Sequence, residues 1–220
     1  MPKFDTTTPI TAVIDIPAGR IRLVTAERAD TTVEVRPADA SKSRDVTAAE
    51  RTTIDYTDGV LRIESPTKNR VLGHPGSIEV TVQLPAGSDI EAKAAGAEFH
   101  GAGRLGDVRF DGALGEIKLD EAATVRITTA AGDVTIGRLT GPAEITTAKG
   151  DIRITEATSG TVVLSTQAGN VTVGAAAGVS AALDAGTGYG RVSNSLKNDG
   201  ATELTIRATT SYGDIDAHSR

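Results

Sequence analysis

The sequence has no cysteine, no tryptophan and one methionine in 220 residues, and aromatic residues make up only 3% of it. With so few aromatic side chains, the core must be built from Val, Ile, Leu and Ala. The 24 glycines, and the threonines at strand-like positions, suit short strands joined by tight turns, so we expect an all-β protein. A chain without cysteine is compatible with the cytoplasm, where disulfides are rare, and also with the outside of the cell.

Long hydrophobic runs and clusters of one charge sign are also missing. No stretch approaches the roughly 20 apolar residues of a membrane span, and the first residues show no basic segment followed by an apolar one. The net charge is −6, and acidic and basic residues alternate, whereas nucleic-acid binding depends on clustered Lys and Arg. We therefore expect a soluble, cytoplasmic protein that binds no nucleic acid and does not insert into a membrane.

An internal repeat lies within the most informative stretch, Thr124–Arg153. Val125–Ile136 reappears 18 residues later as Ala143–Ile154, and both copies alternate apolar and polar residues around a Gly-Asp pair. A fixed period of roughly 20 residues is typical of a solenoid, whose repeating unit buries its apolar face only by stacking on its neighbours.

A glycine, then Asp or Asn, then Val or Ile, marks every second predicted strand in this region. Because the motif occurs on alternate strands, each coil should contain two strands, and the coils should form a parallel solenoid with two facing sheets. Gly190-Arg191-Val192 keeps the same frame but has lost the acidic residue. The complete motif begins at Gly132, Gly150, Gly169 and Gly213.

The alternation also assigns the interior of the coils, because successive side chains of a strand point to opposite faces. Arg126, Thr135, Glu144, Arg153 and Thr172 should point outward. The predicted inward residues are Val125, Ile127, Val134, Ile136, Ile145, Ile152, Ile154, Val162, Leu164, Val171 and Val173.

Residues 1–88 lack the repeat, and we interpret them as an N-terminal antiparallel β region. Three alternating runs, Ile10–Ile16, Arg20–Thr25 and Thr32–Arg36, are separated by turn residues and predict an antiparallel meander. An open terminal coil exposes unpaired backbone groups. We therefore expect this region to cap a solenoid formed by residues 89–220.

Two other segments of the N-terminal region have recognisable patterns. Ser43 is placed to cap a short helix that continues to Glu50. Ser65–Gly76 contains two prolines and two glycines, which predicts a loop.

Asp133, Asp151, Asn170 and Asp214 should occupy one corner of successive coils. Stacked carboxylates about 5 Å apart are suited to binding a hard cation such as calcium. Asp and Asn that follow Gly more often satisfy the backbone groups of a turn. We favour turn chemistry, because calcium-binding solenoids place glycines more densely around each aspartate.

A second candidate site is a set of carboxylates on neighbouring predicted strands. Sugar-cleaving β-helix enzymes use two such residues as acid and base or as nucleophile, but glycosidases usually need aromatic platforms for the sugar rings. We expect no catalytic residues, and the alternative is a carbohydrate-active or calcium-dependent enzyme that uses residues 107–120. The carboxylates are Asp107, Asp111, Glu116 and Asp120, and the three scattered tyrosines are Tyr56, Tyr189 and Tyr212.

Other chemistry-bearing residues form no recognisable site. His74, His100 and His218 share no ligand spacing, so we interpret them as surface histidines and expect no metal site and no cofactor. The glycine-rich segment Gly186–Gly190 lacks the Lys of a phosphate-binding loop and is better explained as a widened corner.

Hydroxyl side chains line up on three successive predicted coils as Thr128-Thr129, Thr146-Thr147 and Ser165-Thr166. Such a flat array is able to contact ordered water or another sheet. The β-propensity of Thr explains the array without any such contact, and we prefer that explanation.

These motifs resemble a bacterial family of β-strand-repeat proteins known as candidate adhesins or toast-rack domains. The resemblance rests on the Gly-Asp-Val/Ile coils, on Leu84-Pro85-Ala86-Gly87 before them and on Thr210–Ile215 at the end. It covers nearly the whole chain and is strongest over residues 85–217. It implies a link to cell-envelope stress for some members, and it implies no catalytic motif whose residues could be transferred to this chain.

The sequence therefore favours a non-enzymatic scaffold or protein-interaction module. We expect a protein partner or self-association through the C-terminal coil, Glu203–Ala217, because only three residues follow it. Tyr212 would then be a contact residue, and Thr205→Pro would block the ladder hydrogen bonds of the contact. Such a contact produces a two-fold dimer or, head to tail, a filament.

Overall fold

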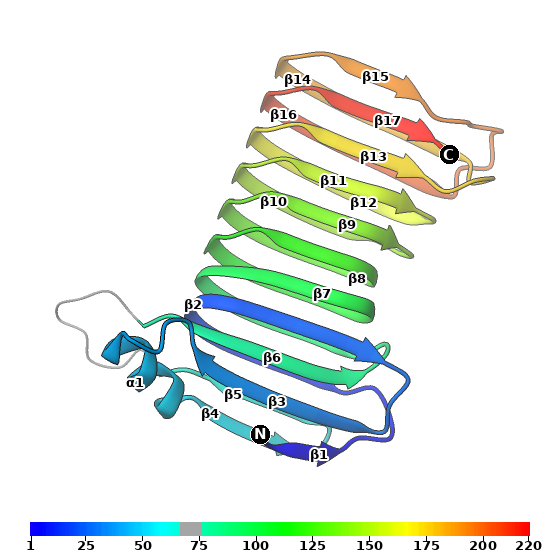
Figure 1. Ribbon diagram of the computed structural model, residues 1–220. Coiled ribbons are helices and arrows are strands. Elements are labelled where there is room, and N and C mark those ends of the chain that lie inside the picture. Colours follow the sequence, from blue (N-terminus) through cyan, green and yellow to red (C-terminus); the bar gives the residue numbers. More distant parts are fainter. Residues whose placement is uncertain (67–75) are drawn as a thin grey trace. The chain divides into compact units, whose positions relative to one another are not determined.

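The computed structural model describes residues 1–66 and 76–220, in which nearly all regular structure is β-strand (Figure 1). The all-β class and the parallel two-sheet β-solenoid predicted from the sequence are confirmed. The chain forms two compact units, Met1–Gly115 and Glu116–Arg220.

The first unit is built around β2 (Thr11–Ala26), a strand of 16 residues that bends in its middle. Its first half pairs in parallel with β5 and with the start of β7, and its second half pairs in parallel with β6 and with a later part of β7. The other elements of this unit are β1 (Lys3–Asp5), β3 (Asp30–Pro37), α1 (Ser43–Arg51), β4 (Thr53–Thr57), β5 (Val60–Glu64), β6 (Ile78–Pro85) and β7 (Asp89–Leu114).

The predicted meander is therefore wrong in part. Ile10–Ile16 and Arg20–Thr25 are not antiparallel neighbours, because both runs belong to the bent strand β2. The predicted antiparallel pairing does occur in this region, where β1 pairs with β3, β3 with β6, and β4 with β5. The alternation located the strands correctly, but it does not distinguish a turn that reverses the chain from a corner that bends it.

The bend of β2 depends on Gly19. Its φ of 129° lies in a region that favours glycine, and a Cβ there would come within 1.8 Å of the Ile78 carbonyl oxygen on the neighbouring strand. The core behind the bend contains two buried aromatic residues of the first unit, Phe99 and Phe110, whose ring centroids lie 5.2 Å apart.

The predicted helix is confirmed as α1, but its cap is not. Ser43 is the first helical residue, and Lys42 occupies the cap position without a side-chain hydrogen bond to the helix. In the described part of the chain, no helix combines the length and apolar character needed to cross a membrane. The predicted loop Ser65–Gly76 lies mostly outside the described residues.

The second unit consists of stacked coils with two strands each, arranged in two facing sheets (Figure 1). One sheet contains the later part of β8 and the other even-numbered strands, and the second sheet contains the first part of β8 and the odd-numbered strands. All neighbours within a sheet are parallel. The strands are β8 (Ile117–Ala131), β9 (Val134–Leu139), β10 (Ala143–Lys149), β11 (Ile152–Ala157), β12 (Gly160–Ala168), β13 (Val171–Ala175), β14 (Ala181–Tyr189), β15 (Val192–Ser195), β16 (Leu204–Tyr212) and β17 (Ile215–Ser219).

The strand register confirms the sequence repeat. Ile145 lies opposite Ile127 on β8 and opposite Leu164 on β12, so equivalent residues of successive coils stack directly. Each of the eleven residues predicted to point inward is at most 1% exposed, whereas those predicted to point outward are exposed or half-buried. The core of this unit is therefore a stack of aliphatic side chains between the two sheets.

The last coil of the chain is not the last coil of the stack. β16 lies between β12 and β14, and β17 lies between β13 and β15. Figure 1 shows this insertion as the red strand β17 between the yellow β13 and the orange β15. The outermost coil at this end is therefore formed by β14 and β15, although two more strands follow them in the sequence.

We predict that Ile145→Ala or Ile152→Ala lowers the free energy of unfolding by about 2–4 kcal/mol, because each leaves a cavity in the stacked core. Both side chains are 0% exposed. Thr135→Ala, a change to an outward side chain of β9, should cost less than about 0.5 kcal/mol. Urea denaturation measures the three differences, and equal losses for the inward and outward changes would contradict the assigned register.

Candidate functional site

The predicted carboxylate site is divided between the two units. Asp107 and Asp111 lie on β7 of the first unit, whereas Glu116 and Asp120 belong to the second. The Glu116 carboxylate forms an ion pair of 2.7 Å with the Nζ of Lys118. The backbone N–H of Asp107 donates a hydrogen bond of 2.8 Å to Oδ1 of Asp89. The four residues are therefore divided between two units, and the Glu116 carboxylate is already held by a neighbouring lysine.

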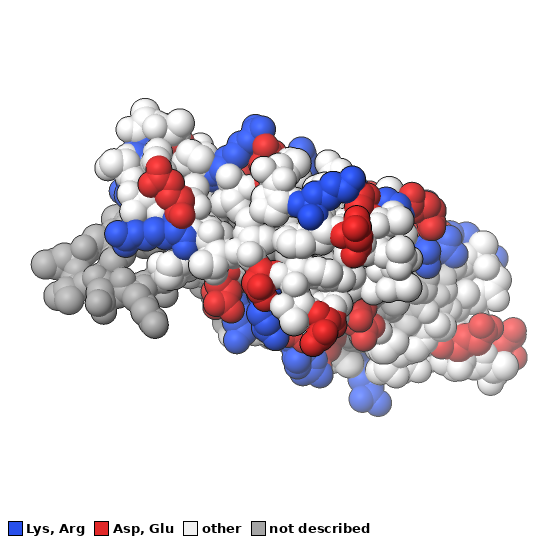
Figure 2. Space-filling model, turned by 90° about the horizontal axis from the view of Figure 1, so that it is seen from below, with Lys and Arg blue, Asp and Glu red and all other residues white. Residues whose placement is uncertain are grey.

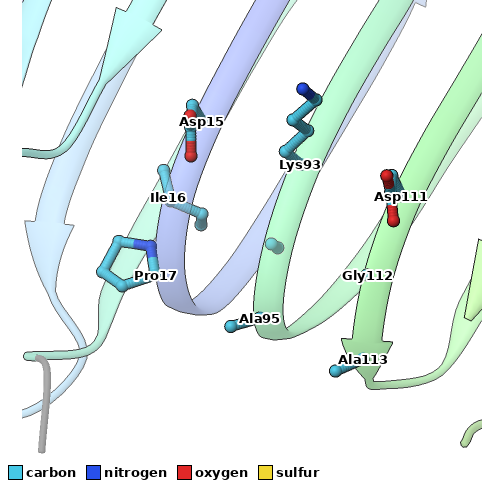
Figure 3. A pocket seen from close by; sticks show the side chains of 9 residues that line it. Asp15, Ile16, Pro17, Lys93, Ala95, Asp111, Gly112 and Ala113 are labelled. Atoms are coloured by element: carbon cyan, nitrogen blue, oxygen red, sulfur yellow. The ribbon is translucent and has the colours of Figure 1, made fainter. Parts of the chain in front are cut away.

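Asp111 does line a depression in the surface of the first unit. Figure 3 shows the carboxylate of Asp111 and the ammonium of Lys93 on two successive passes of the long strand β7, and the carboxylate of Asp15 on β2, with Lys93 in the middle. The remainder of the lining is small or aliphatic and includes Pro17 and Ala95. A glycosidase places its two carboxyl groups on either side of a sugar bond, but here a lysine lies between them and no aromatic ring lines the depression.

A second row of alternating charges crosses the same unit. Arg20 on β2 donates from Nε to Oε2 of Glu98 at 2.8 Å and from Nη1 to Oε1 of Glu79 at 3.2 Å. All three side chains are partly exposed. Figure 2 likewise shows acidic and basic side chains interspersed on the visible face. These charges form cross-strand pairs between neighbouring strands.

The Gly-Asp motif forms a hydrogen-bonded ladder along one corner of the second unit. The side-chain oxygen of each Asp or Asn accepts a hydrogen bond from the backbone N–H of the equivalent residue in the next coil. In the order of the stack, Asp133 accepts from Asp151 at 2.8 Å, Asp151 from Asn170 at 2.7 Å, and Asn170 from Asp214 at 2.8 Å. The predicted turn chemistry is therefore confirmed.

The ladder ends where the stack ends. Oδ1 of Asp214 accepts from the backbone N–H of Arg191 at 2.9 Å, and Oδ2 of Asp214 pairs with the Arg191 guanidinium at 3.2 Å. Arg191 lies in the outermost coil, so no further coil has a backbone N–H that needs its side chain as an acceptor. The sequence motif loses its acid at this position because the last coil needs no acceptor.

The glycine of the motif is required by the close approach of the coils. A Cβ at Gly150 would lie 2.2 Å from the carbonyl oxygen of Gly132, and one at Gly169 would lie 2.0 Å from the carbonyl oxygen of Gly150. These are backbone atoms that cannot move aside without separating the coils. The same corner therefore needs glycine for space and Asp or Asn for hydrogen bonding.

The predicted hydroxyl pairs have two roles, one on each side of the sheet. Of the inward members, Thr166 donates to the carbonyl oxygen of Gly150 at 3.1 Å and Thr147 to that of Lys149 at 3.3 Å. Thr210 and Thr187, which continue this row, donate to the carbonyl oxygens of Gly169 and Gly213, both at 2.9 Å. The outward members form an exposed or half-buried row on the even-numbered sheet. This row consists of Thr128, Thr146, Ser165 and Thr209.

The two histidines of the described residues, His100 and His218, do not form a site together. His218 Nδ1 lies 3.0 Å from the Asp216 carboxylate on the same strand, and His100 lies on β7 of the other unit. His74 lies outside the described residues. Within residues 1–66 and 76–220, no group of three or more His, Asp or Glu side chains is arranged to hold a metal ion.

The two predicted interaction residues lie on β16, which is paired on both sides. Thr205 lies between Thr161 of β12 and Ala182 of β14, so the expectation that this coil forms the open end of the stack is wrong. A proline at this position would break an internal ladder rather than block a contact. Tyr212 is 61% exposed, and its role in a contact stays a prediction.

The outermost coil exposes residues whose counterparts are buried in every coil inside it. Val192 of β15 is 46% exposed, whereas its neighbours in the same row, Ile215 and Val171, are at most 1% exposed. Among the described strands, β14 pairs only with β16 and β15 only with β17. We call residues 181–195, which comprise β14 and β15, the open edge.

Two tyrosines that are far apart in the sequence meet at the open edge. The rings of Tyr189 and Tyr212 are stacked, with centroids 5.1 Å apart and planes inclined by 4°. Tyr189 is 72% exposed and lies in the outermost coil. Tyr56, by contrast, packs against Phe4 in the first unit. Sequence reasoning missed this cluster because it placed the coils in sequence order, although the missing acid before Val192 was a signal of the true end.

The family of the chain follows from its coils and from a comparison with known families. The family model Toastrack DUF4097 matches residues 11–220. The chain belongs to this family. No curated protein matches it in sequence.

Solved structures similar to this chain come from bacteria. A candidate adhesin from Bacteroides fragilis NCTC 9343 is 15% identical, with a TM-score of 0.54 over 98% of this chain and 95% of its own. A candidate adhesin from Parabacteroides distasonis ATCC 8503 is 13% identical, with a TM-score of 0.46 over 98% of this chain and 96% of its own. At such identities the likeness to the Bacteroides protein shows the fold alone.

We predict that the corner ladder depends on the acceptor oxygen rather than on the charge. Asp151→Ala should lower the free energy of unfolding by about 0.5–1.5 kcal/mol, because the N–H of Asn170 loses its partner. Asp151→Asn should cost clearly less, because Asn170 itself performs the same role for Asp214. Urea denaturation measures the loss of unfolding free energy in each variant. Equal losses from Asp151→Ala and Asp151→Asn would show that the negative charge matters rather than the acceptor oxygen.

We also predict that acid weakens the attachment of the outermost coil. The hydrogen bond from the Arg191 backbone, followed by that from its side chain, lowers the pKa of Asp214. A carboxylate with a lowered pKa stabilises the fold above its ordinary pKa of about 4, and this contribution is lost as the pH falls through the folded value. Unfolding measured from pH 6 to pH 2 should depend less steeply on pH in Asp214→Asn than in the wild type. Identical profiles would contradict this role.

Proposed function

We propose that this protein is a non-enzymatic protein-interaction module that binds its partner through the open edge. The observation that carries the proposal is the outermost coil, where Tyr189 and Val192 are exposed at positions that continue the stack. Exposed aromatic residues in a well-ordered setting are typical centres of protein interfaces. A strand with one free side is a common docking site for another β-strand.

The distribution of charged residues supports a binding role over catalysis. Many carboxylates are used in cross-strand pairs or in the corner ladder, as for Glu98 with Arg20 and Asp151 with Asn170. The solved structures of the same fold include candidate adhesins, which is consistent with a protein that acts by contact. The carbohydrate-active or calcium-dependent alternative has no comparable support.

The place and process in which the module acts are part of the proposal. The sequence favours a cytoplasmic protein, and the resemblance noted above links some members of the family to cell-envelope stress. Fractionation of the cell that makes the protein tests the location. Survival of a deletion strain under envelope-damaging agents tests the process, and wild-type survival would remove the envelope link without affecting the binding proposal.

Site-specific photo-crosslinking tests the proposed contact. A photoreactive phenylalanine analogue at Tyr189 should form an adduct in the native cell, because this ring lies on the contact surface. The same analogue at Arg153, an exposed residue of the inner strand β11, is the control. We expect an adduct from position 189 that is absent or at least several-fold weaker from position 153. Equal adducts from both positions, or none from 189, would rule out the open edge as the contact.

A further inference from the structure

We infer that the partner of the open edge is a second copy of this chain, joined edge to edge across a two-fold axis. The inference rests on the proposed role of the open edge and names its occupant.

The open edge requires a partner with two strands. β14 and β15 belong to facing sheets, and such sheets lie about 10 Å apart. Between them lies the apolar layer that inner coils bury, represented here by Val192 and the half-buried Leu183. An extended peptide added to β14 would leave β15 and this layer uncovered. A coil of the same cross-section covers all three, and a second open edge supplies one.

The corner ladder argues against continuing the stack in parallel. The coils of Asp133, Asp151, Asn170 and Asp214 each offer a side-chain oxygen to the N–H of the next coil, but the outermost coil offers Arg191, whose side chain has only donors. A parallel coil placed on the open edge would therefore find its corner N–H without an acceptor. In a two-fold contact, β14 runs antiparallel to β14 of the second copy. The corner of one copy then does not have to supply an acceptor oxygen to the corner N–H of the other.

The short strands β1 and β4 of the first unit are also unsuited to a head-to-tail contact. β1 has only three residues, and Lys3 on it pairs with Asp30 at 3.1 Å. β4 is a short strand that pairs with β5, and its Tyr56 packs against Phe4 of β1 with ring centroids 5.2 Å apart. Short strands with charged residues are features that protect a sheet edge from pairing.

The charge and size of the open edge suit contact with an identical surface. The whole chain carries a net charge of −6, but residues 181–195 contain one acid, Asp184, and one base, Arg191, and are therefore neutral. Two copies that meet here avoid the repulsion that other faces of an acidic protein would produce. The outward side of β14 carries Ala182, Asp184, Gly186 and Gly188, so Asp184 is the one side chain longer than a methyl group on this face. The Ala181 N–H at the start of the strand donates to the Lys197 carbonyl oxygen at 2.9 Å, so the inferred contact begins after this residue.

A charge-swap experiment tests the inferred dimer. Gly186 lies near the middle of β14, and a Cβ there would meet no atom within 4 Å, so longer side chains fit without refolding. In a two-fold contact centred on β14, residue 186 of one copy lies near residue 186 of the other. Gly186→Lys and Gly186→Glu should each weaken the dimer at least tenfold, and an equal mixture of the two should restore association to near the wild-type level.

Sedimentation equilibrium over a concentration series measures these dissociation constants, with circular dichroism to verify that each variant is folded. Thr146→Lys is the matched control, because Thr146 lies in the same row of the sheet but on the inner strand β10, and it should dimerise like the wild type. A wild-type monomer up to about 1 mM, or variants that dimerise unchanged, would overturn the inference. So would species larger than a dimer that grow with concentration, since they indicate head-to-tail stacking.

The two proposals fail in different ways. If the adduct from position 189 contains a different protein and the chain is monomeric, the interaction module stands and the second copy is wrong. If position 189 forms no adduct and the chain still forms a dimer that the Gly186 variants do not affect, both the open edge and the inferred contact are wrong.

Discussion

The close approach of successive coils at one corner is the constraint on which the second unit depends. Glycine is needed there because a Cβ would collide with a backbone carbonyl of the neighbouring coil, as at Gly150 and Gly169. Asp or Asn is needed beside it because the next backbone N–H must be satisfied. With this corner in register, the aliphatic residues of each coil stack directly, and the core closes without aromatic side chains. The composition, poor in aromatics and rich in Gly and Thr, is a consequence of that geometry.

The same constraint determines where the stack ends. Arg191, whose side chain offers no acceptor, lies in the outermost coil, where no further N–H has to be satisfied. β14 and β15 form this outermost coil. The strands that follow them in the sequence, β16 and β17, lie between this coil and the coil of β12 and β13. The final residues of this chain are therefore held on both sides by hydrogen-bonded strands, while an internal segment forms the exposed end. This arrangement brings Tyr189 and Tyr212 together, although 23 residues of sequence separate them. The hydrogen bond between Arg191 and Asp214 spans the same separation.

The functional proposals follow from where the regular structure is incomplete. Along the coils, charged side chains such as Arg20 and Glu98 serve cross-strand pairing, and such exposed pairs contribute little stability individually. The depression beside Asp111 has the carboxylates of an acid–base site, but it also has a lysine between them and no ring to hold a sugar. The open edge differs from both, because it combines strands paired on one side, exposed apolar residues and a rigid aromatic pair.

The sequence alone determined the local and periodic features of this protein. Period-two alternation predicted the strands and the inward residues, since side-chain direction depends only on strand geometry. The 18-residue repeat and the Gly-Asp corners predicted the coils, because those contacts recur between adjacent repeats. The N-terminal pairing, by contrast, could not be read from Pro17 and Gly19, since the same residues suit a reversal or a bend. The order of the last two coils was decided by tertiary structure alone, because hydrogen bonds between β12 and β16 join residues 44 positions apart and leave no local pattern. The site was missed for that reason: the open edge is defined by which strand lacks a neighbour, and only the assembled stack reveals it.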